Sequence, residues 1–177
     1  PLGNSFDYVA QDTTMSEKSW EKAESRMQRE ALDRAIVKAK ISPSSLHYIY
    51  AGDLINQCII SAYGIRGMEN PFIGLYGACS TMAESLMLAA MAVDGQFAQY
   101  AAAVTSSHFA SAERQYRFPL EYGGQRPPTA QWTVTGAGAA VLASEGQGPY
   151  ITRACAGKIV DFGITDANNM GAAMAPA

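Results

Sequence analysis

The sequence predicts an α/β domain in which helices and strands alternate along the chain. The first observation is a helical pattern over residues 16–39, which a short Ser/Pro loop separates from the β-rich run 46–51. The second is the apolar run 72–76, which stops at Gly77 and is followed by another helical pattern. Such alternation is typical of a layered α/β domain.

Length and composition fit one domain with a single core, since the 177 residues are 48% hydrophobic. The net charge of −3, without a cluster of Lys or Arg, argues against a nucleic-acid partner. The longest apolar stretch, residues 86–93, is too short to cross a bilayer, and no signal peptide opens the chain. Neither an EF-hand loop nor a dense carboxylate cluster is present, so we expect no resident metal. The abrupt start, without an initiator methionine, looks like a cut.

The first helix is expected over residues 16–39, after a capping box at Thr14 and Glu17. In such a box the Thr14 hydroxyl accepts from the Glu17 N–H, and the Glu17 carboxylate accepts from the Thr14 N–H. Residues 41–45 end the helix, because a residue that precedes proline disfavours the α region. The apolar positions of this helix form one stripe that should face the core: Trp20, Ala23, Met27, Ala31, Leu32, Ala35 and Ile36.

The remaining segments continue the alternation. A short helix is expected over residues 54–63, and a longer one follows Cys79 and stops at Asp94 and Gly95. Residues 106–131 form a long polar loop, which in a compact domain is usually functional or an interface. The tail, residues 163–177, has no packing pattern of its own. The segments that read as strands are residues 46–51, 72–76, 100–105, 134–143 and 150–158, and the last two are expected to pair.

Cys79 has the most informative position, because it follows a strand and a glycine turn and precedes a helix. Unpaired N–H groups and the helix dipole stabilise a thiolate at a helix N-terminus, so we expect Cys79 to be the most reactive thiol. The alternative is a small buried apolar residue, which is a common fate of free cysteine. Cys58 and Cys155 fall within an expected helix and strand, and the three cysteines have no disulfide or zinc spacing.

Other polar candidates also follow strand ends, where sites in α/β domains gather. His108 comes after the strand 100–105, whereas His47 lies within a strand and reads as structural. Asp53 and Asn56 follow the strand 46–51, and turn or capping chemistry explains them equally well. The arginines of the long loop suit either surface and interface contacts or recognition of a carboxylate: Arg114, Arg117 and Arg126.

Several stretches together resemble the stage V sporulation protein AD family of spore-forming Firmicutes. The Gly77-Ala78-Cys79-Ser80 string also resembles the nucleophile turn of the thiolase superfamily. The unusual stretch from Glu113 to Gly124 belongs to no common enzyme signature. The stretches that carry the resemblance are residues 51–57, 72–82, 105–108, 112–119, 121–125, 133–136, 160–166 and 170–177.

The resemblance implies a thiolase-like fold, in which two similar halves stack into an αβαβα body that usually dimerises. Each half is a five-stranded mixed sheet flanked by helices. Residues 1–177 match the first half, without the second half and without a strand expected before Pro1. That strand lies at the centre of the sheet in thiolases, so its neighbours should lose their ladder partners. By analogy, the dimer should bury the strand 100–105 and part of residues 106–131.

The resemblance further implies a protein that binds dipicolinic acid for uptake into the developing spore. Its expected partners are dipicolinic acid, other stage V sporulation proteins and a second copy of itself. Its expected place is peripheral, on the cytoplasmic side of the forespore or spore inner membrane. No cofactor is expected, and calcium only as the dipicolinate chelate. The alternative is a thiolase-like or ketosynthase-like acyltransferase with Cys79 as nucleophile, whose other catalytic groups lie outside the chain.

The expected ligand is a small planar dianion, so its pocket needs hydrogen-bond donors and a slot for the ring. Tyr or Phe residues would form the slot. The residues expected to bind the ligand are Cys79, Ser80, His108, Asp53, Asn56, Arg114 and Arg117.

Overall fold

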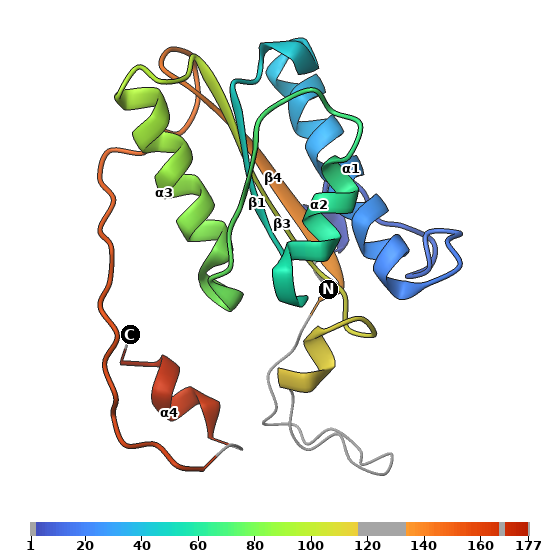
Figure 1. Ribbon diagram of the computed structural model, residues 1–177, viewed down its shortest axis with the longest axis vertical. Coiled ribbons are helices and arrows are strands. Elements are labelled where there is room, and N and C mark those ends of the chain that lie inside the picture. Colours follow the sequence, from blue (N-terminus) through green and yellow to red (C-terminus); the bar gives the residue numbers. More distant parts are fainter. Residues whose placement is uncertain (1–2, 117–133, 167–168, 177) are drawn as a thin grey trace.

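A four-stranded mixed sheet lies at the centre of the protein, as the computed structural model of residues 3–116, 134–166 and 169–176 shows (Figure 1). The strand order is β2-β1-β3-β4. The strands are β1 (Tyr48–Gly52), β2 (Phe72–Gly74), β3 (Tyr100–Ser107) and β4 (Gly136–Ala143). The α-helices are α1 (Trp20–Ala39), α2 (Ile59–Ile65), α3 (Thr81–Asp94) and α4 (Met170–Met174). The short 3₁₀ helices are η1 (Gly3–Ser5), η2 (Pro43–Ser45), η3 (Asn56–Cys58), η4 (Ala78–Ser80) and η5 (Glu113–Tyr116).

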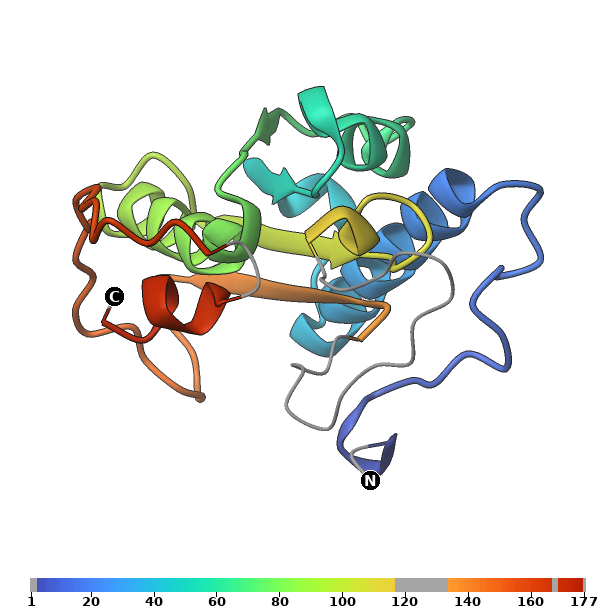
Figure 2. The same cartoon turned by 90° about the horizontal axis from the view of Figure 1, so that it is seen from below.

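Helices cover both faces of the sheet, with α1 on one side and α3 on the other (Figure 2). Successive side chains of a strand point to opposite faces. Ile49 and Ala51 of β1 therefore pack in the core with Leu32 of α1, and Tyr50 packs in the second core with Ala89 of α3. The α/β class predicted from the sequence is confirmed.

The sheet is continuous between β1 and β3, which pair directly in parallel with Tyr48 opposite Ala101 and Gly52 opposite Thr105. β2 is also parallel to β1, and β4 is antiparallel to β3. We expected two strands to lose their ladder partners because of a missing central strand. That expectation is wrong for this chain, because the two strands satisfy each other's backbone groups.

β3 is enclosed within the chain, which corrects the predicted dimer interface. Residues Ala101, Ala102, Ala103 and Val104 are 0% exposed, since β1 and β4 flank the strand and helices cover both faces. Such a strand has no surface to bury against a second copy. Much of the loop 106–131, the other part of that interface, lies outside the described residues.

The start of α1 differs from the prediction. Ser19 is the N-cap, and its hydroxyl accepts from the Lys22 N–H at 3.3 Å. Met15 and Ser16 have φ values of 51° and 59°, so the chain turns tightly there instead of entering the helix. The Thr14 hydroxyl accepts from the Ser16 N–H, and the capping box expected with Glu17 is therefore wrong.

The buried face of α1 is rotated from the predicted apolar stripe and includes two polar residues. Ala23, Leu32 and Ile36 are buried as predicted, but Glu24 and Gln28 continue the line of Leu32 and Ile36 along the helix. Trp20 is exposed, and Met27, Ala31 and Ala35 are half-buried. The predicted stripe was based on hydrophobicity alone. Glu24 and Gln28 are buried because they form hydrogen bonds with residues on other elements.

Residues 144–166 contain no helix or strand, so the strand predicted over 150–158 is wrong. Every side chain of residues 150–158 is exposed, and the segment runs apart from the sheet (Figure 1). Ile151 is the one bulky aliphatic side chain there, so the segment has no apolar face to bury. The helix predicted over 54–63 is also displaced, since Gln57 and Cys58 are left-handed and α2 begins at Ile59.

The strands predicted over 46–51, 72–76, 100–105 and 134–143 are confirmed, with shifts only at their ends. In the part of the chain that the structure describes, every helix is too short or too polar to cross a membrane.

Candidate functional site

The candidate residues gather at one edge of the sheet, where the parallel strands β1, β2 and β3 end. The starts of α2 and α3 and the short helix η5 lie along this edge, at the bottom of Figure 1. Carboxyl ends of parallel strands form the usual binding edge of α/β sheets. The sequence correctly placed Cys79 there, between β2 and α3.

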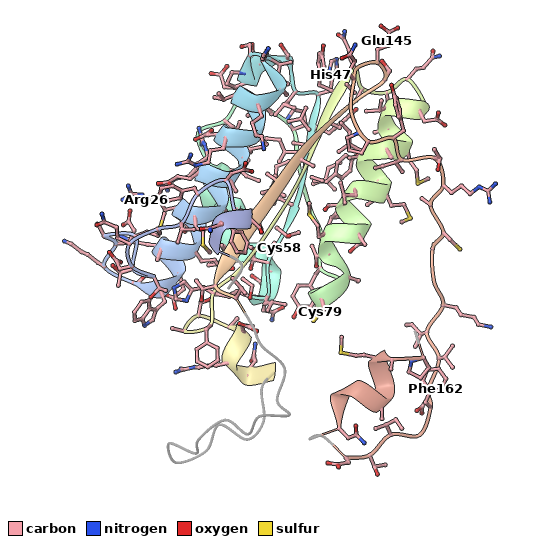
Figure 3. The ribbon with its side chains drawn as sticks, turned by 180° about the vertical axis from the view of Figure 1, so that it is seen from behind. Arg26, His47, Cys58, Cys79, Glu145 and Phe162 are labelled. Atoms are coloured by element: carbon pink, nitrogen blue, oxygen red, sulfur yellow. The ribbon has the colours of Figure 1, made fainter. Side chains whose placement is uncertain are left out.

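The turn that carries Cys79 is closed by its own hydroxyl groups. The Thr81 hydroxyl accepts from the Gly77 N–H at 3.1 Å and donates to the Ala78 carbonyl at 2.8 Å. The Ser80 hydroxyl donates to the Gly77 carbonyl at 2.7 Å. Ala78 has a φ of 47°, which a non-glycine residue rarely adopts. Cys79 and Ser80 are exposed, and Cys79 lies at the start of α3 (Figure 3).

Two glycines allow the turn to pack closely. A Cβ on Gly52, the last residue of β1, would lie 2.2 Å from the Leu75 carbonyl oxygen. A Cβ on Gly77 would lie 2.5 Å from the Ser80 Oγ and 2.7 Å from the Glu84 Oε2. Glycine is therefore needed at position 52, where the obstacle is backbone, whereas at position 77 the obstacles are the ends of side chains. A carboxylate, that of Glu84, lies beside the Cys79 turn.

Cys58 is a buried thiol at the start of α2. Its Sγ donates to the Leu75 carbonyl oxygen at 3.2 Å. Burial raises the pKa of the Cys58 thiol, and the negative charges of Asp53 and Glu84 add to this effect. Cys58 is thus held as a neutral thiol. It is also the one buried cysteine, since Cys79 and Cys155 are exposed.

Asp53 holds the start of α2 and is only 2% exposed. Its Oδ1 accepts from the Ile55 N–H at 2.9 Å. Its Oδ2 accepts from both the N–H and the hydroxyl of Ser61, at 2.8 and 2.6 Å. Both carboxylate oxygens are therefore used in capping and turn contacts.

Gln28 connects this carboxylate to a second one. Its Nε2 lies within hydrogen-bond distance of the Gly52 carbonyl and of the Ser61 and Ser106 hydroxyls, at 3.2, 3.0 and 3.2 Å. Ser61 donates onward to Asp53, and Ser106 donates to Glu24 at 2.9 Å. The Gln28 Oε1 has no hydrogen-bond partner among the described residues.

Glu24 is 1% exposed and accepts from two serine hydroxyls, those of Ser106 and Ser111. Burial raises the pKa of the Glu24 carboxyl, although these hydrogen bonds oppose the shift. Sequence reasoning missed Glu24 and Gln28. Their i, i+4 spacing with Leu32 and Ile36 was the signal that could have found them.

His108 ties the N-terminal segment to the end of β3. Its Nδ1 accepts from the Ala110 N–H at 3.1 Å, so Nε2 carries the proton and donates to the Thr13 carbonyl at 2.8 Å. The ring is 2% exposed and lies 5.2 Å from the Trp20 ring. Both nitrogens of His108 are thus used within the chain.

The predicted ligand residues therefore divide into two groups. Cys79, Ser80, Asn56 and Arg114 are exposed, whereas Asp53 and His108 are buried and hydrogen-bonded. Arg117 and Arg126 lie outside the described residues. His47 lies at the opposite end of the sheet from Cys79 (Figure 3). Within residues 3–116, 134–166 and 169–176, no imidazole has a ring nitrogen available beside Cys79, and no cluster of metal-ligating side chains was found.

The fold is similar to that of solved ketosynthases. One is a priming β-ketosynthase from a polyketide biosynthetic pathway, with a TM-score of 0.54, 19% identity and coverage of 72% of this chain and 36% of that one. Another is a β-ketoacyl-[acyl carrier protein] synthase III from Thermus thermophilus, with a TM-score of 0.51, 17% identity and coverage of 71% and 38%. These likenesses concern the fold alone, which is thiolase-like as predicted.

Sequence comparison identifies the family. The chain is 46% identical over 177 residues to stage V sporulation protein AD of Bacillus subtilis (strain 168), and it spans 52% of the length of that relative. The profile of the stage V sporulation protein AD family matches residues 1–177. The chain belongs to the stage V sporulation protein AD family.

Proposed function

We propose that the protein binds dipicolinic acid at the turn around Cys79 and supports its uptake into the developing spore. The observation that carries this proposal is the exposed Cys79–Ser80 turn at the N-terminus of α3, which has no free imidazole beside it in the described residues. A thiol nucleophile needs a base to activate it. A turn without one suits binding better than acyl transfer.

The chemistry of the edge fits a planar anion. The N-terminus of α3 offers backbone N–H groups and the positive end of the helix dipole. Arg114 is exposed on η5 at the same edge, and the Tyr76 ring is exposed one residue before Gly77. The arginine would pair with a carboxylate, and the ring would form one wall of the slot.

Glu84 decides which form of the ligand fits. Its Oε2 lies beside the Gly77 turn and would repel a free dianion. The calcium chelate of dipicolinate carries less negative charge, so calcium enters as part of the cargo and not as a resident cofactor. Binding should therefore be tighter with calcium present.

The protein would act with other stage V sporulation proteins, peripherally on the cytoplasmic side of the forespore or spore inner membrane. It would also form a homodimer. Among the described strands, β2 and β4 have one neighbour each. A dimer that extends the sheet would form through one of these two edges.

Calorimetry with dipicolinate, with and without calcium, tests the proposed site. Without calcium, Cys79→Glu should weaken binding at least about tenfold through steric clash and like-charge repulsion, while Cys79→Ala should be mild. Glu84→Gln should strengthen binding of free dipicolinate and reduce the benefit of calcium. Cys155→Glu is the matched control, since Cys155 is also exposed but lies on the segment away from the sheet. Equal affinity of the wild type and Cys79→Glu would place the ligand elsewhere.

The second candidate function is acyl transfer by Cys79. The exposed thiol at a strand-to-helix turn favours it, and the matched solved structures include ketosynthases. The other catalytic groups would then lie beyond the described residues. A covalent acyl adduct on Cys79 after incubation with an acyl-CoA would support this function over binding alone.

A further inference from the structure

A cavity of about 630 Å³ lies between the N-terminal segment, α1 and β4. We call residues 5–15 the strap, because this segment lines one side of the cavity, opposite α1 and the start of β4. The floor is made of small side chains: Ala31 and Ala35 of α1 and Gly136, Ala137, Gly138 and Ala139 of β4. The cavity borders α1, whereas Cys79 precedes α3 on the other face of the sheet.

Polar contacts hold the strap above the floor without filling the space. The Lys38 Nζ lies 2.8 Å from the Asp7 Oδ1, and the Arg34 guanidinium stacks 4.2 Å from the centre of the Tyr8 ring. At the other end, the Arg26 guanidinium donates to the Met15 carbonyl at 2.7 Å. His108 donates to the Thr13 carbonyl, as described above. The cavity is thus a supported feature of the fold.

Arg34, which lines the cavity, has no carboxylate partner among the described residues. Lys38 is paired with Asp7, and Glu30 is paired with Arg26. The third carboxylate of the lining, that of Asp12, accepts from the N–H and the hydroxyl of Thr14. No ion pair joins Arg34 to a carboxylate in the part of the chain that the structure describes. An arginine stacked on an aromatic ring keeps its N–H edge available for a bidentate carboxylate. Its position on a mostly apolar cavity therefore favours a ligand with one acidic group.

We propose that this cavity binds an amphipathic monocarboxylate of the fatty-acid type. The carboxylate pairs with Arg34, and the apolar chain lies on the small residues between α1 and β4. A volume of about 630 Å³ is within the range of small-molecule sites. This site is separate from the proposed dipicolinate site, and the inference does not depend on that function.

Calorimetry of the full chain with decanoate and with decanol tests the proposal, because the two probes share an apolar chain and differ in charge. The wild type should bind decanoate about two- to fivefold more tightly than decanol, as expected for an ion pair with an exposed arginine. Arg34→Gln should lose this preference and keep its affinity for decanol. Arg29→Gln is the matched control, since Arg29 lies on the same helix, pairs with Asp33 and does not line the cavity. It should bind both probes like the wild type.

A second variant tests the position of the apolar chain. Ala35→Phe places a ring on the cavity floor and should abolish saturable binding of both probes, with a melting curve that shows a folded chain. The proposal is overturned if the wild type does not bind decanoate, if decanol binds as tightly, or if a folded Ala35→Phe keeps both affinities. Because Arg34 is exposed, the Arg34→Gln comparison remains decisive even if Ala35→Phe does not fold.

Discussion

The three cysteines occupy three different environments. Cys58 is buried and donates to the Leu75 carbonyl, whereas Cys79 and Cys155 are exposed. Cys79 lies directly before α3, at a helix N-terminus. Cys155 lies on an extended segment with no helix beside it in the sequence. Cys58 thus differs from the other two cysteines in its burial. Cys79 differs from Cys155 in its position at the N-terminus of a helix.

We predict that iodoacetamide at neutral pH labels Cys79 first, Cys155 next and Cys58 last. The reason for the last place is that burial raises the pKa of the Cys58 thiol and blocks access to it. Mass mapping after brief labelling gives the order. Labelling in denaturant is the control and should make the three rates similar. Faster labelling of Cys58 than of Cys79 in the native protein would contradict the prediction.

The position of Cys79 could be predicted from the sequence, and the network under it could not. A strand, a glycine and a helical pattern are local signals, and they placed Cys79 correctly. Glu24 is buried because Ser106 and Ser111, more than eighty residues away, donate to it. A single sequence does not show such distant partners, so a polar residue on a helix reads as solvated.

At the scale of elements, the end of β1 packs directly against the turn between β2 and α3. Gly52 has no room for a Cβ, which would lie 2.2 Å from the Leu75 carbonyl oxygen and 2.5 Å from the Thr81 Cγ2. The carbonyl belongs to the backbone that leads into the Cys79 turn. A larger residue at position 52 would therefore displace the turn itself.

Gly52→Ala should lower the free energy of unfolding by about 1–3 kcal/mol, as overpacking of a tight contact does. Urea denaturation measures this loss. Gly138→Ala is the matched control, because Gly138 is also a strand glycine and a Cβ there would meet nothing within 4 Å. That control should be neutral or slightly stabilising. Equal stability of Gly52→Ala and the wild type would show that the turn can shift without strain.

Helices and strands were predicted correctly where the local sequence pattern matches the burial of the side chains. The buried run that became β3 is apolar throughout its first half, and its strand was confirmed. Residues 150–158 have a strand-like composition but no continuous apolar face, and they remain exposed. The direct pairing of β1 with β3 could not be predicted, because strand order depends on contacts between distant segments.

For the whole molecule, the buried polar network joins elements that lie far apart in the sequence. Gln28 of α1 contacts the end of β1, Ser61 of α2 and Ser106 of β3. Glu24 connects the loop after β3 to this network, because its carboxylate accepts from the Ser111 hydroxyl. The network therefore links one face of the sheet to the edge that carries the candidate site, and the charge of Glu24 acts on the stability of the entire fold.

Glu24 should make the protein less stable as pH rises above about 4.5, its ordinary pKa. Burial raises the pKa of Glu24 in the folded chain, so in this range the folded state holds a proton that the unfolded state has lost. The contribution of Glu24 to the free energy of unfolding is fully present below pH 4.5 and is lost as pH rises through the pKa of the folded state. The loss is at most about 1.4 kcal/mol per pH unit.

Glu24→Gln removes the titrating group and keeps a side chain of similar shape. Urea denaturation between pH 4 and pH 8 should show that the stability of the wild type relative to Glu24→Gln declines with rising pH. Glu21→Gln, an exposed position on the same helix, is the control and should retain the slope of the wild type. A parallel pH dependence of the wild type and Glu24→Gln would mean that the carboxyl titrates alike in both states. The Ser106 and Ser111 hydroxyls would then offset the cost of burying its charge.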